Sequence, residues 1–401
     1  MKIVRVAAAL LGNSPVVRVV TDEGIEGFGQ VEHSKPFVLP LVEFFEQPLL
    51  GLDPTDVERC MVAIRRLGGT KPWGAVVSAI EMALWDVFGK SCGLPVHKLL
   101  GGKTRDRVRV YNGPVRAPLG DHNPEDYARA AQVMKDAPEG FTIIKEGVGY
   151  HGFMSTNVPG YMLGTPRPGP RHPNRGPLTE RGLTHTVECV AAMKDVLDDG
   201  VGLALDMGPG HTISDSLRLL RAMEPFNLLW AEDLLTGDYV PWVHAEQYRE
   251  LTRGTTTPTH TGEQIYLRHG FTELIETNAV RVIGPDPADV GGLAELKWVA
   301  EYADLHGIQI APHGVLDGII GLAALVQVCA TLPENFIAFE YTKPEHSWWY
   351  SITDGLGPDC VRDGFIEVPA RPGLGITFDV EAARTHLRPQ DADFFDWEAT
   401  R

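Results

Sequence analysis

Three carboxylates end three successive apolar runs in the middle of the chain. The runs are VGLALD, NLLWAE and TPTHTGE, and the acids are Asp206, Glu232 and Glu263. Their spacings are 26 residues (232 − 206) and 31 residues (263 − 232), about the length of one strand, one helix and two loops. A single acid after a strand is commonly a helix cap or a surface residue. Three on neighbouring parallel strands would lie side by side and offer hard oxygen ligands to a divalent cation.

Three further polar groups end the next apolar runs. They are Asp286 in IGPD, His313 in IAPH and Glu340 in AFEY, and both intervals are 27 residues (313 − 286 and 340 − 313). On adjacent strands an aspartate can accept the proton of one imidazole nitrogen, which leaves the other nitrogen to act as a base. The sequence therefore predicts an acid/base pair beside the cation site.

Lys145 lies inside the apolar run TIIKEGV. Because side chains alternate along a strand, Ile143, Lys145 and Gly147 share one face, which we take as the inward face. An inward lysine could hold a substrate carboxylate, or serve as a base with a lowered pKa. The structural alternative is a lysine whose ammonium extends to the rim of the fold.

These groups require a fold that brings the ends of many parallel strands together. From about residue 108, short apolar runs alternate with amphipathic helical stretches, a pattern typical of a TIM-type (β/α) barrel. The runs are VRVYN, TIIKEGV, VGLALDM, NLLWAED, TPTHTGE, RVIGPD, IQIAPH and FIAFEY. An open doubly wound sheet usually has a glycine-rich phosphate loop after its first strand, and YNGPVRAPLG does not match GxGxxG.

Other segments flank or interrupt the predicted barrel. Residues 1–107 combine paired strands with the helical run WGAVVSAIEMALWDVFGK, and we expect an α+β capping domain there. The barrel is predicted to span residues 108–355. Within it, residues 149–182 are a proline- and glycine-rich insertion that we expect to be a lid or an oligomer contact. Residues 356–401 are expected to return to the capping domain.

Composition limits the partners. The chain has 401 residues and a formal net charge of −17, which argues against nucleic acid or an anionic membrane as a partner. Its five cysteines are scattered without a CxxC pair, so we expect a reduced, cytoplasmic protein. The apolar part of the N-terminus is brief and runs into a patterned strand, which is not typical of a signal peptide or a membrane span.

The ordered motifs resemble the enolase superfamily and, more narrowly, its mandelate racemase/muconate lactonizing enzyme subgroup. They are VTDEGIEGFG, AIEMALWD with GLPVHKLLGG, the three spaced acids, PDPADVGG, APH, FEY and RPGLG, and they cover nearly the whole chain except residues 149–182. The resemblance implies a (β/α)7β barrel with a capping domain formed by the N-terminal region and the C-terminal tail. It also implies Mg²⁺-assisted removal of the proton α to a carboxylate, through an enediolate.

The resemblance also assigns roles to residues. It implies Asp206, Glu232 and Glu263 as Mg²⁺ ligands and His313 with Asp286 as the acid/base dyad. Glu340 would bind the substrate carboxylate as a neutral acid, or else accept a hydrogen bond from a substrate hydroxyl. Further substrate contacts are expected from Lys145, His211, Trp73 and Trp348.

One position departs from the subgroup. Its members commonly carry KxK on the second barrel strand, where this chain has Lys145, Glu146 and Gly147. Racemisation requires bases on both faces of the carbon, whereas loss of water requires one base and an acid for the leaving hydroxyl. We therefore favour a hydro-lyase that dehydrates an aldonate or aldarate to a 2-keto-3-deoxy acid. His313 would be the base, and the same imidazolium, Tyr150 or His151 would be the acid.

Two other hypotheses stay open at this point. One is a racemase, epimerase or cycloisomerase that acts on a related carboxylate through the same enediolate. The other is a non-catalytic protein of the same fold that binds sugar acids. In each case we expect a small carboxylate as the ligand and a homo-oligomeric assembly.

Overall fold

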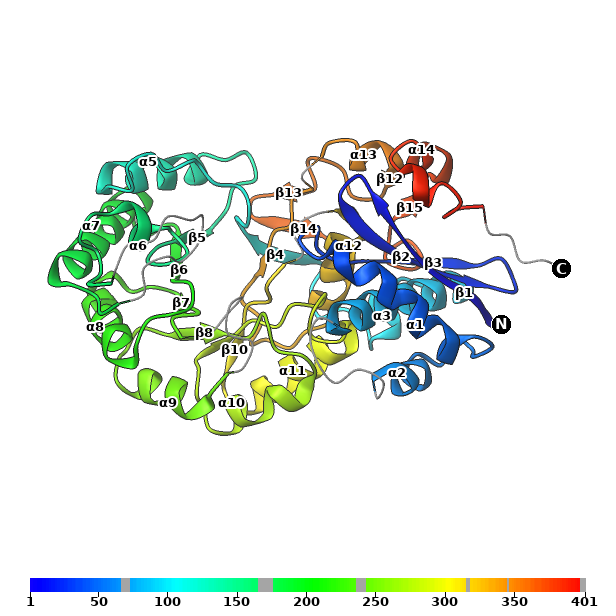
Figure 1. Ribbon diagram of the computed structural model, residues 1–401, viewed down its shortest axis with the longest axis horizontal. Coiled ribbons are helices and arrows are strands. Elements are labelled where there is room, and N and C mark those ends of the chain that lie inside the picture. The colour runs from blue at the N-terminus through cyan, green and yellow to red at the C-terminus, as the bar shows by residue number, and fades with distance from the viewer. Residues whose placement is uncertain (66–72, 165–175, 236–242, 315–317, 345, 397–401) are drawn as a thin grey trace.

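The apolar runs after residue 107 form the parallel strands of a barrel in the computed structural model, which describes residues 1–65, 73–164, 176–235, 243–314, 318–344 and 346–396 (Figure 1). Strands β5 to β10 pair in parallel in chain order, and β11 pairs in parallel with β4. The barrel strands are β4 (Arg107–Tyr111), β5 (Ile143–Gly147), β6 (Gly202–Asp206), β7 (Ala231–Glu232), β8 (Thr259–Thr261), β9 (Val282–Ile283), β10 (Gln309–Ile310) and β11 (Phe339–Glu340).

Two junctions close the ring. Between β10 and β11, Ile337 N donates to Ile310 O (2.9 Å) and Glu340 N donates to Pro312 O (3.0 Å). Between β4 and β5, the side chain of Asn112 accepts from Lys145 N (2.6 Å) and donates to Lys145 O (3.1 Å). A side-chain amide thus satisfies the backbone of the strand that carries Lys145.

Helices cover the outside of the strands (Figure 1). Helix α8 illustrates why they form: the hydroxyl of Thr212 caps its first turn by accepting from Asp215 N (3.1 Å), and one face buries Leu219, Leu220 and Met223. The helices of this layer are α5 (Pro124–Lys135), α6 (Met154–Asn157), α7 (Glu180–Leu197), α8 (Ile213–Met223), η2 (Glu224–Phe226), α9 (Ala245–Arg253), η3 (Arg268–Gly270), α10 (Thr272–Glu276), α11 (Leu293–Leu305) and α12 (Ile319–Cys329). The predicted (β/α)7β barrel is confirmed.

The inside of the barrel is a packed layer. It combines small and aliphatic side chains with the rings of Tyr111 and Trp230, and every member is buried. The layer consists of Tyr111, Ile143, Ala204, Trp230, Val282, Ala311 and Ala338. Because this layer closes the barrel below, polar residues at the strand ends can only face the open end above.

The N-terminal region forms the predicted α+β capping domain. Strands β1 (Ile3–Leu11), β2 (Ser14–Thr21) and β3 (Glu26–Gln30) form an antiparallel sheet. A Cβ atom at Gly29 would lie 1.8 Å from Ala79 O, so glycine is required where the sheet packs on the long helix. The helices are η1 (Pro36–Val38), α1 (Leu39–Leu49), α2 (Val57–Arg65), α3 (Trp73–Cys92) and α4 (Val96–Leu99).

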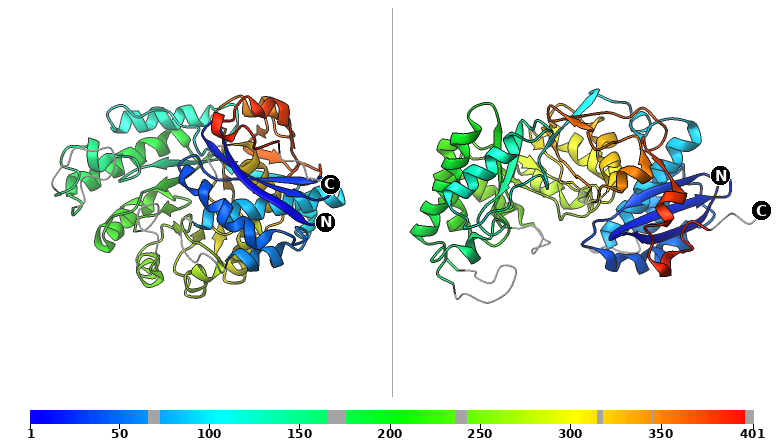
Figure 2. Two further views of the ribbon diagram at one scale, coloured as in Figure 1. Left: turned by 45° about the vertical axis from the view of Figure 1, so that its right-hand side comes forward. Right: turned by 90° about the horizontal axis from the view of Figure 1, so that it is seen from above.

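The C-terminal tail contacts both parts of the protein (Figure 2). Its strand β14 pairs antiparallel with barrel strand β4, while Gly12 N of the capping domain donates to His386 O (2.8 Å). The tail elements, with the short helix before them, are α13 (Trp349–Ile352), β12 (Thr353–Asp354), β13 (Val361–Arg362), β14 (Phe365–Glu367), β15 (Thr377–Phe378), α14 (Val380–Arg384) and η4 (Pro389–Asp391). The domain limits at 107/108 and 355/356 stay predictions.

The predicted insertion is described only in part, because residues 165–175 lie outside the described residues. Its described parts include α6 and an antiparallel bridge between Met162 and Leu178. Its role as a lid or an oligomer contact stays a prediction. Among the helices that the structure describes, none combines the length and the apolar character needed to cross a membrane.

Candidate active site

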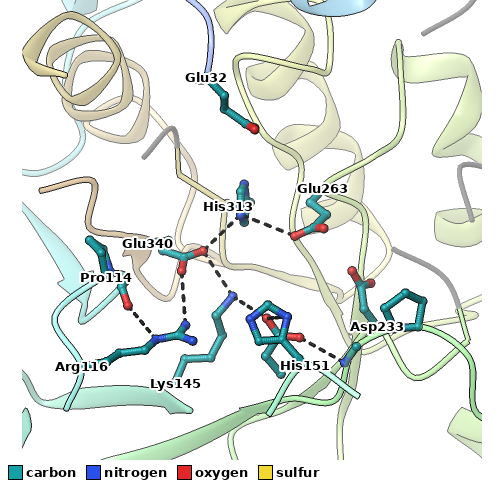
Figure 3. Close-up of a pocket in the computed structure, with 13 residues that line it drawn as sticks. Glu32, Pro114, Arg116, Lys145, His151, Asp233, Glu263, His313 and Glu340 are labelled. Carbon is teal, nitrogen blue, oxygen red and sulfur yellow. Dashed lines mark hydrogen bonds and ion pairs between the residues drawn. The ribbon is translucent and has the colours of Figure 1, made fainter. Parts of the chain in front are cut away.

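A cavity of about 260 Å³ lies at the carboxyl ends of the barrel strands (Figure 3). Five of the predicted strand residues line it, namely Lys145, Asp206, Glu263, His313 and Glu340, and so does His151, one of the expected acids. Two more lie directly beside these, since Glu232 contacts Lys145 and Asp286 contacts His313. The fold thus brings together all seven strand-end residues that the sequence singled out.

The acids on β6, β7 and β8 are set by strand register. Gly147, Asp206 and Glu232 are partners across β5, β6 and β7, so they stand in one row, and Glu263 follows the end of β8. Asp206 Oδ1 accepts from Gly208 N (3.2 Å) and Glu232 Oε2 accepts from Trp230 Nε1 (3.0 Å). The carboxylates are therefore oriented before any ligand binds.

Lys145 is a buried cation among these acids. Its Nζ lies 2.9 Å from Glu232 Oε1, 3.2 Å from Glu340 Oε2 and 3.7 Å from Asp206 Oδ2. Burial alone would lower the pKa of Lys145, but the neighbouring carboxylates outweigh burial and hold this pKa well above its ordinary value. This environment suits an ammonium that holds a substrate carboxylate, and the alternative role of Lys145 as a base stays a prediction.

The cation also acts on its neighbours. Burial raises the pKa of Glu232 and of Glu340, but Lys145, helped by His260 and His313 respectively, outweighs it and lowers both. Glu340 is therefore ionised. Of its two expected roles, the structure favours an acceptor for a substrate hydroxyl over a neutral acid.

Asp233 is a further acid that the sequence interpretation missed. One oxygen each of Glu232, Asp233 and Glu263 lie within 4.8 Å of one another, and Thr261 Oγ1 donates to Asp233 Oδ1 (2.6 Å). Burial, then the charges of Glu263 and Glu232, hold the pKa of Asp233 well above its ordinary value. Carboxylates that repel one another at this spacing are a donor set that fits a divalent cation of hard character.

The predicted dyad is present on the next two strands. His313 Nδ1 is hydrogen-bonded to Asp286 Oδ2, and Asp286 Oδ1 accepts from Ala288 N (2.6 Å). The other imidazole nitrogen, Nε2, faces the cavity at 3.5 Å from both Glu263 Oε2 and Glu340 Oε2. Burial opposes protonation of His313, but the charges of Glu263, Glu340 and Asp286 outweigh it and raise the pKa of His313 well above its ordinary value.

His151 occupies the space above Gly147. A Cβ atom at Gly147 would lie 2.8 Å from His151 Cδ2, and one at Gly208, where φ is +67°, would lie 2.6 Å from His151 N. His151 Nδ1 is 3.4 Å from Asp206 Oδ2, and the ring lies on the side of the cavity away from His313 (Figure 3). The glycine that breaks the KxK pattern thus makes room for an imidazole from the following loop.

Two cavity residues come from unexpected segments. Arg116 follows β4, donates to Gly113 O (2.9 Å) and approaches Glu340 Oε1 at 3.9 Å. Glu32 reaches the cavity from the capping domain (Figure 3). Arg116 left a signal in the sequence, a cation shortly after the first barrel strand, whereas Glu32 lies far away in the chain, next to the loop around His33.

Several predicted contacts lie elsewhere. His211 is buried and packs on Tyr150, with ring centroids 4.7 Å apart, and neither residue lines the cavity. Trp348 stacks on His386 at 3.9 Å, because Gly12 offers no side chain to prevent it. His211 and Trp348 therefore lie away from the cavity in this conformation, and their role as substrate contacts stays a prediction. Trp73 begins α3, but its side chain lies outside the described part of the structure.

Comparisons with known proteins agree with this architecture. Residues 6–101 match the mandelate racemase/muconate lactonizing enzyme N-terminal domain, and residues 126–383 match the enolase C-terminal domain-like family. The chain is 32% identical to a D-xylonate dehydratase of Haloferax volcanii over 393 residues, which are 94% of this chain and 86% of that protein. It is 29% identical to a D-galactonate dehydratase of Variovorax paradoxus, over 91% of this chain and 88% of the relative.

A solved structure gives the same result. The mandelate racemase/muconate lactonizing enzyme-like protein from Rubrobacter xylanophilus superposes with a TM-score of 0.82 at 33% identity, over 97% of this chain and 98% of the other. The family matches extend over both the capping domain and the barrel, and the structural match includes the strands that carry the cavity residues. The chain therefore belongs to the enolase superfamily, in its mandelate racemase/muconate lactonizing enzyme subgroup.

Proposed function

We propose that this protein is a Mg²⁺-dependent hydro-lyase that dehydrates an aldonate or aldarate to a 2-keto-3-deoxy acid. The observation that carries the proposal is the pair of imidazoles, because His313, oriented by Asp286, and His151, over Gly147 on the other side of the cavity, can supply the base and the acid that dehydration needs. The same pair would also serve racemisation, so the relatives carry the choice of dehydration. Two curated relatives that are similar over nearly the whole chain are named as dehydratases of sugar acids.

Asp206, Glu232 and Glu263, with Asp233 beside them, would hold the Mg²⁺. When bound, the ion supplies Lewis-acid stabilisation of negative charge on the substrate carboxylate. Lys145 and Arg116 are cationic residues that line the cavity, and they would hold the same carboxylate by charge. Glu340, being ionised, would accept a hydrogen bond from a substrate hydroxyl.

His313 Nε2 would remove the α proton, while Asp286 holds the Nδ1 proton and fixes the orientation of the ring. This step requires a neutral imidazole. The charges of Glu263, Glu340 and Asp286 raise the pKa of His313, so a cation that compensates Glu263 would favour the neutral imidazole. Cation binding at the carboxylates and proton removal are in this way coupled.

His151 would act on the leaving group. It would give a proton to the β-hydroxyl as the carbon–oxygen bond breaks, so that one water leaves and an enol remains. The enol then takes up a proton at the β carbon and becomes the 2-keto-3-deoxy acid. Protonation of a hydroxide leaving group in this way is general acid catalysis and contributes about 10²- to 10⁴-fold.

The test is a screen of aldonates and aldarates with Mg²⁺ for formation of a keto acid. We expect turnover of at least one acid, and a loss of about 10³-fold or more in kcat for His313→Asn. Deuterium that enters recovered substrate without any keto acid would instead indicate a racemase or epimerase. Saturable binding of sugar acids with no product would indicate a binding protein. The cytoplasmic location and the homo-oligomeric assembly stay predictions.

A further inference from the structure

Asp286 belongs to a loop whose partners come largely from the capping domain. The loop connects β9 to α11, and it folds back on Asp286, whose carbonyl accepts from Asp289 N (3.0 Å) and Val290 N (2.7 Å). The carboxylate of Asp286 in turn orients His313. A displacement of this loop would therefore displace the imidazole.

Lys35 of the capping domain holds the middle of the loop. Its Nζ lies 2.6 Å from Asp289 Oδ2 and 3.2 Å from Glu32 Oε1. The side chain of Asp289 is only 4% exposed and that of Lys35 is 19% exposed. Because both charges are largely shielded from water, separating them costs more than separating a surface pair. Glu32, the second partner of Lys35, lies beside Asp286 and His313, with one ligand atom of each within 4.8 Å.

Helix α3 holds the end of the same loop. Ser78 Oγ accepts from Gly291 N (2.9 Å), and the carboxylate of Glu81 accepts from Leu293 N (2.7 Å) and Ala294 N (3.0 Å). Glu81 is fully buried, and a Cβ atom at Gly292 would lie 2.2 Å from its Oε2. The carboxyl group of Glu81 therefore packs directly against the backbone at the N-terminus of α11.

We propose that Lys35 and Glu81 are positioning residues for the acid/base dyad. They hold residues 286–294 at two points, Asp289 and the first residues of α11, and they act on the reaction through Asp286. Neither needs to touch the substrate. The inference rests on the proposed function in one respect, namely that His313 is the group that removes the proton.

The first test is kinetic and uses the whole protein. Lys35→Met removes the ammonium and keeps most of the side-chain volume. We expect kcat to fall about 10-fold while KM changes less than about twofold, because a small misplacement of a catalytic group lowers the rate of chemistry more than binding. Lys35→Arg, which keeps a cation, should restore most of the lost rate.

A double variant shows whether Lys35 acts through Asp286. In an Asp286→Asn background, we expect Lys35→Met to lower kcat by less than about twofold further, because the carboxylate through which it acts is already gone. Lys90→Met is the matched control. Lys90 pairs with the buried Asp86 at 2.7 Å within α3, away from the cavity, and its loss should leave kcat unchanged.

The second test does not depend on turnover. A proton on His313 Nδ1 that is hydrogen-bonded to Asp286 should give a strongly downfield proton NMR signal, and Asp286→Asn should remove it. We expect this signal to shift or broaden in Lys35→Met and in Glu81→Gln, and to stay unchanged in Lys90→Met. If the wild-type protein converts no sugar acid, the proposed function fails while this signal still tests the positioning.

Several results would overturn the inference. The first is a wild-type kcat in Lys35→Met, and the second is a change in that variant that is confined to KM. The third is a kcat in the double variant that falls by the full product of the two single losses. The fourth is an NMR signal that neither Lys35→Met nor Glu81→Gln alters. A change in KM alone would instead make Lys35 a substrate contact. Thermal unfolding of each variant identifies any that are not folded at the assay temperature.

Discussion

The two halves of the candidate active site are held in different ways. Asp206 and Glu232 are direct partners in the ladder between β6 and β7, so the hydrogen-bond register of the barrel fixes the carboxylate half. Asp286 and His313 follow β9 and β10, strands of two residues each, and Asp286 lies in a loop that the capping domain holds. One half depends on strand pairing within the barrel, and the other depends on an interface between domains.

The two halves also differ in the charge that they accumulate. The carboxylate half contains Asp206, Glu232, Asp233 and Glu263. Asp206 and Glu232 pair with the ammonium of Lys145, and the raised pKa of Asp233 reflects burial and the charges of Glu263 and Glu232. In the dyad half Asp286 pairs with His313, and Asp289 and Glu32 pair with Lys35. The first half is suited to bind a cation and the second to move a proton, so each can be disrupted separately.

The largest effect is expected from a substitution that disrupts the carboxylate half alone. Glu232→Gln removes one charge from the row of acids and leaves Lys145 with a weaker partner. We expect Mg²⁺ affinity to fall by more than about 100-fold, because changes even in residues that only support metal ligands cost about 10- to 100-fold. Titration calorimetry with Mg²⁺, on protein from which metal has been removed by a chelator, measures this affinity.

The matched control for this variant is Glu301→Gln, which is the same substitution at an exposed glutamate of α11. Its Mg²⁺ affinity should equal that of the wild type. The His313 Nδ1 proton signal should persist in Glu232→Gln, because the dyad does not depend on the register of β6 and β7. Unchanged Mg²⁺ affinity in Glu232→Gln would remove Glu232 from the ligand set.

A smaller effect is expected from a change at Gly147, where the two halves of the site face each other. Gly147→Ala places a methyl group where the ring of His151 lies, and this ring must move. We expect dehydration to slow about 10-fold or more, because His151 is the proposed acid for the leaving hydroxyl. Exchange of the α proton in deuterated water should continue, since His313 is untouched.

Gly357→Ala is the control, because a Cβ atom at Gly357 meets nothing within 4 Å. It should leave both dehydration and exchange unchanged. Equal losses of dehydration and exchange in Gly147→Ala would contradict a separate role for His151. In that case the imidazolium of His313 would serve both steps.

The contrast between the halves also explains what the sequence could predict. The spacing of Asp206, Glu232 and Glu263 follows the repeat of strand and helix, so the barrel and its row of acids follow from periodicity. Lys145 could be placed inward for the same reason, by alternation along β5. These residues lie on regular elements, where local pattern determines direction.

The residues that were missed or misplaced lie where the backbone is irregular or the contact is distant. Asp233 adjoins Glu232 and should face the opposite way, but its φ of +53° departs from strand geometry. Trp348 packs against Gly12 and His386, more than three hundred residues apart in the chain. Lys35 and Glu81 act across a domain interface. No periodicity within a segment encodes such a contact.

The smallest expected effect concerns the interface that holds the dyad half. Burial raises the pKa of Glu81 to about 7 from an ordinary value of 4.5. Between these values the native state keeps a proton that the unfolded chain has lost, so the free energy of unfolding falls as pH rises through this window and levels off above it. For a fully buried group the loss is on the order of 2 kcal/mol between about pH 5 and about pH 8.

Glu81→Gln cannot lose a proton and should lack this dependence. Thermal unfolding of both proteins across the same pH range measures the difference between their midpoints, and we expect the wild type to lose stability relative to the variant as pH rises. Differences that stay constant with pH would mean that Glu81 is already ionised at the lower end. The backbone N–H groups of Leu293 and Ala294 would then stabilise its charge enough to offset burial, and the interface would hold the dyad equally well at every pH in the range.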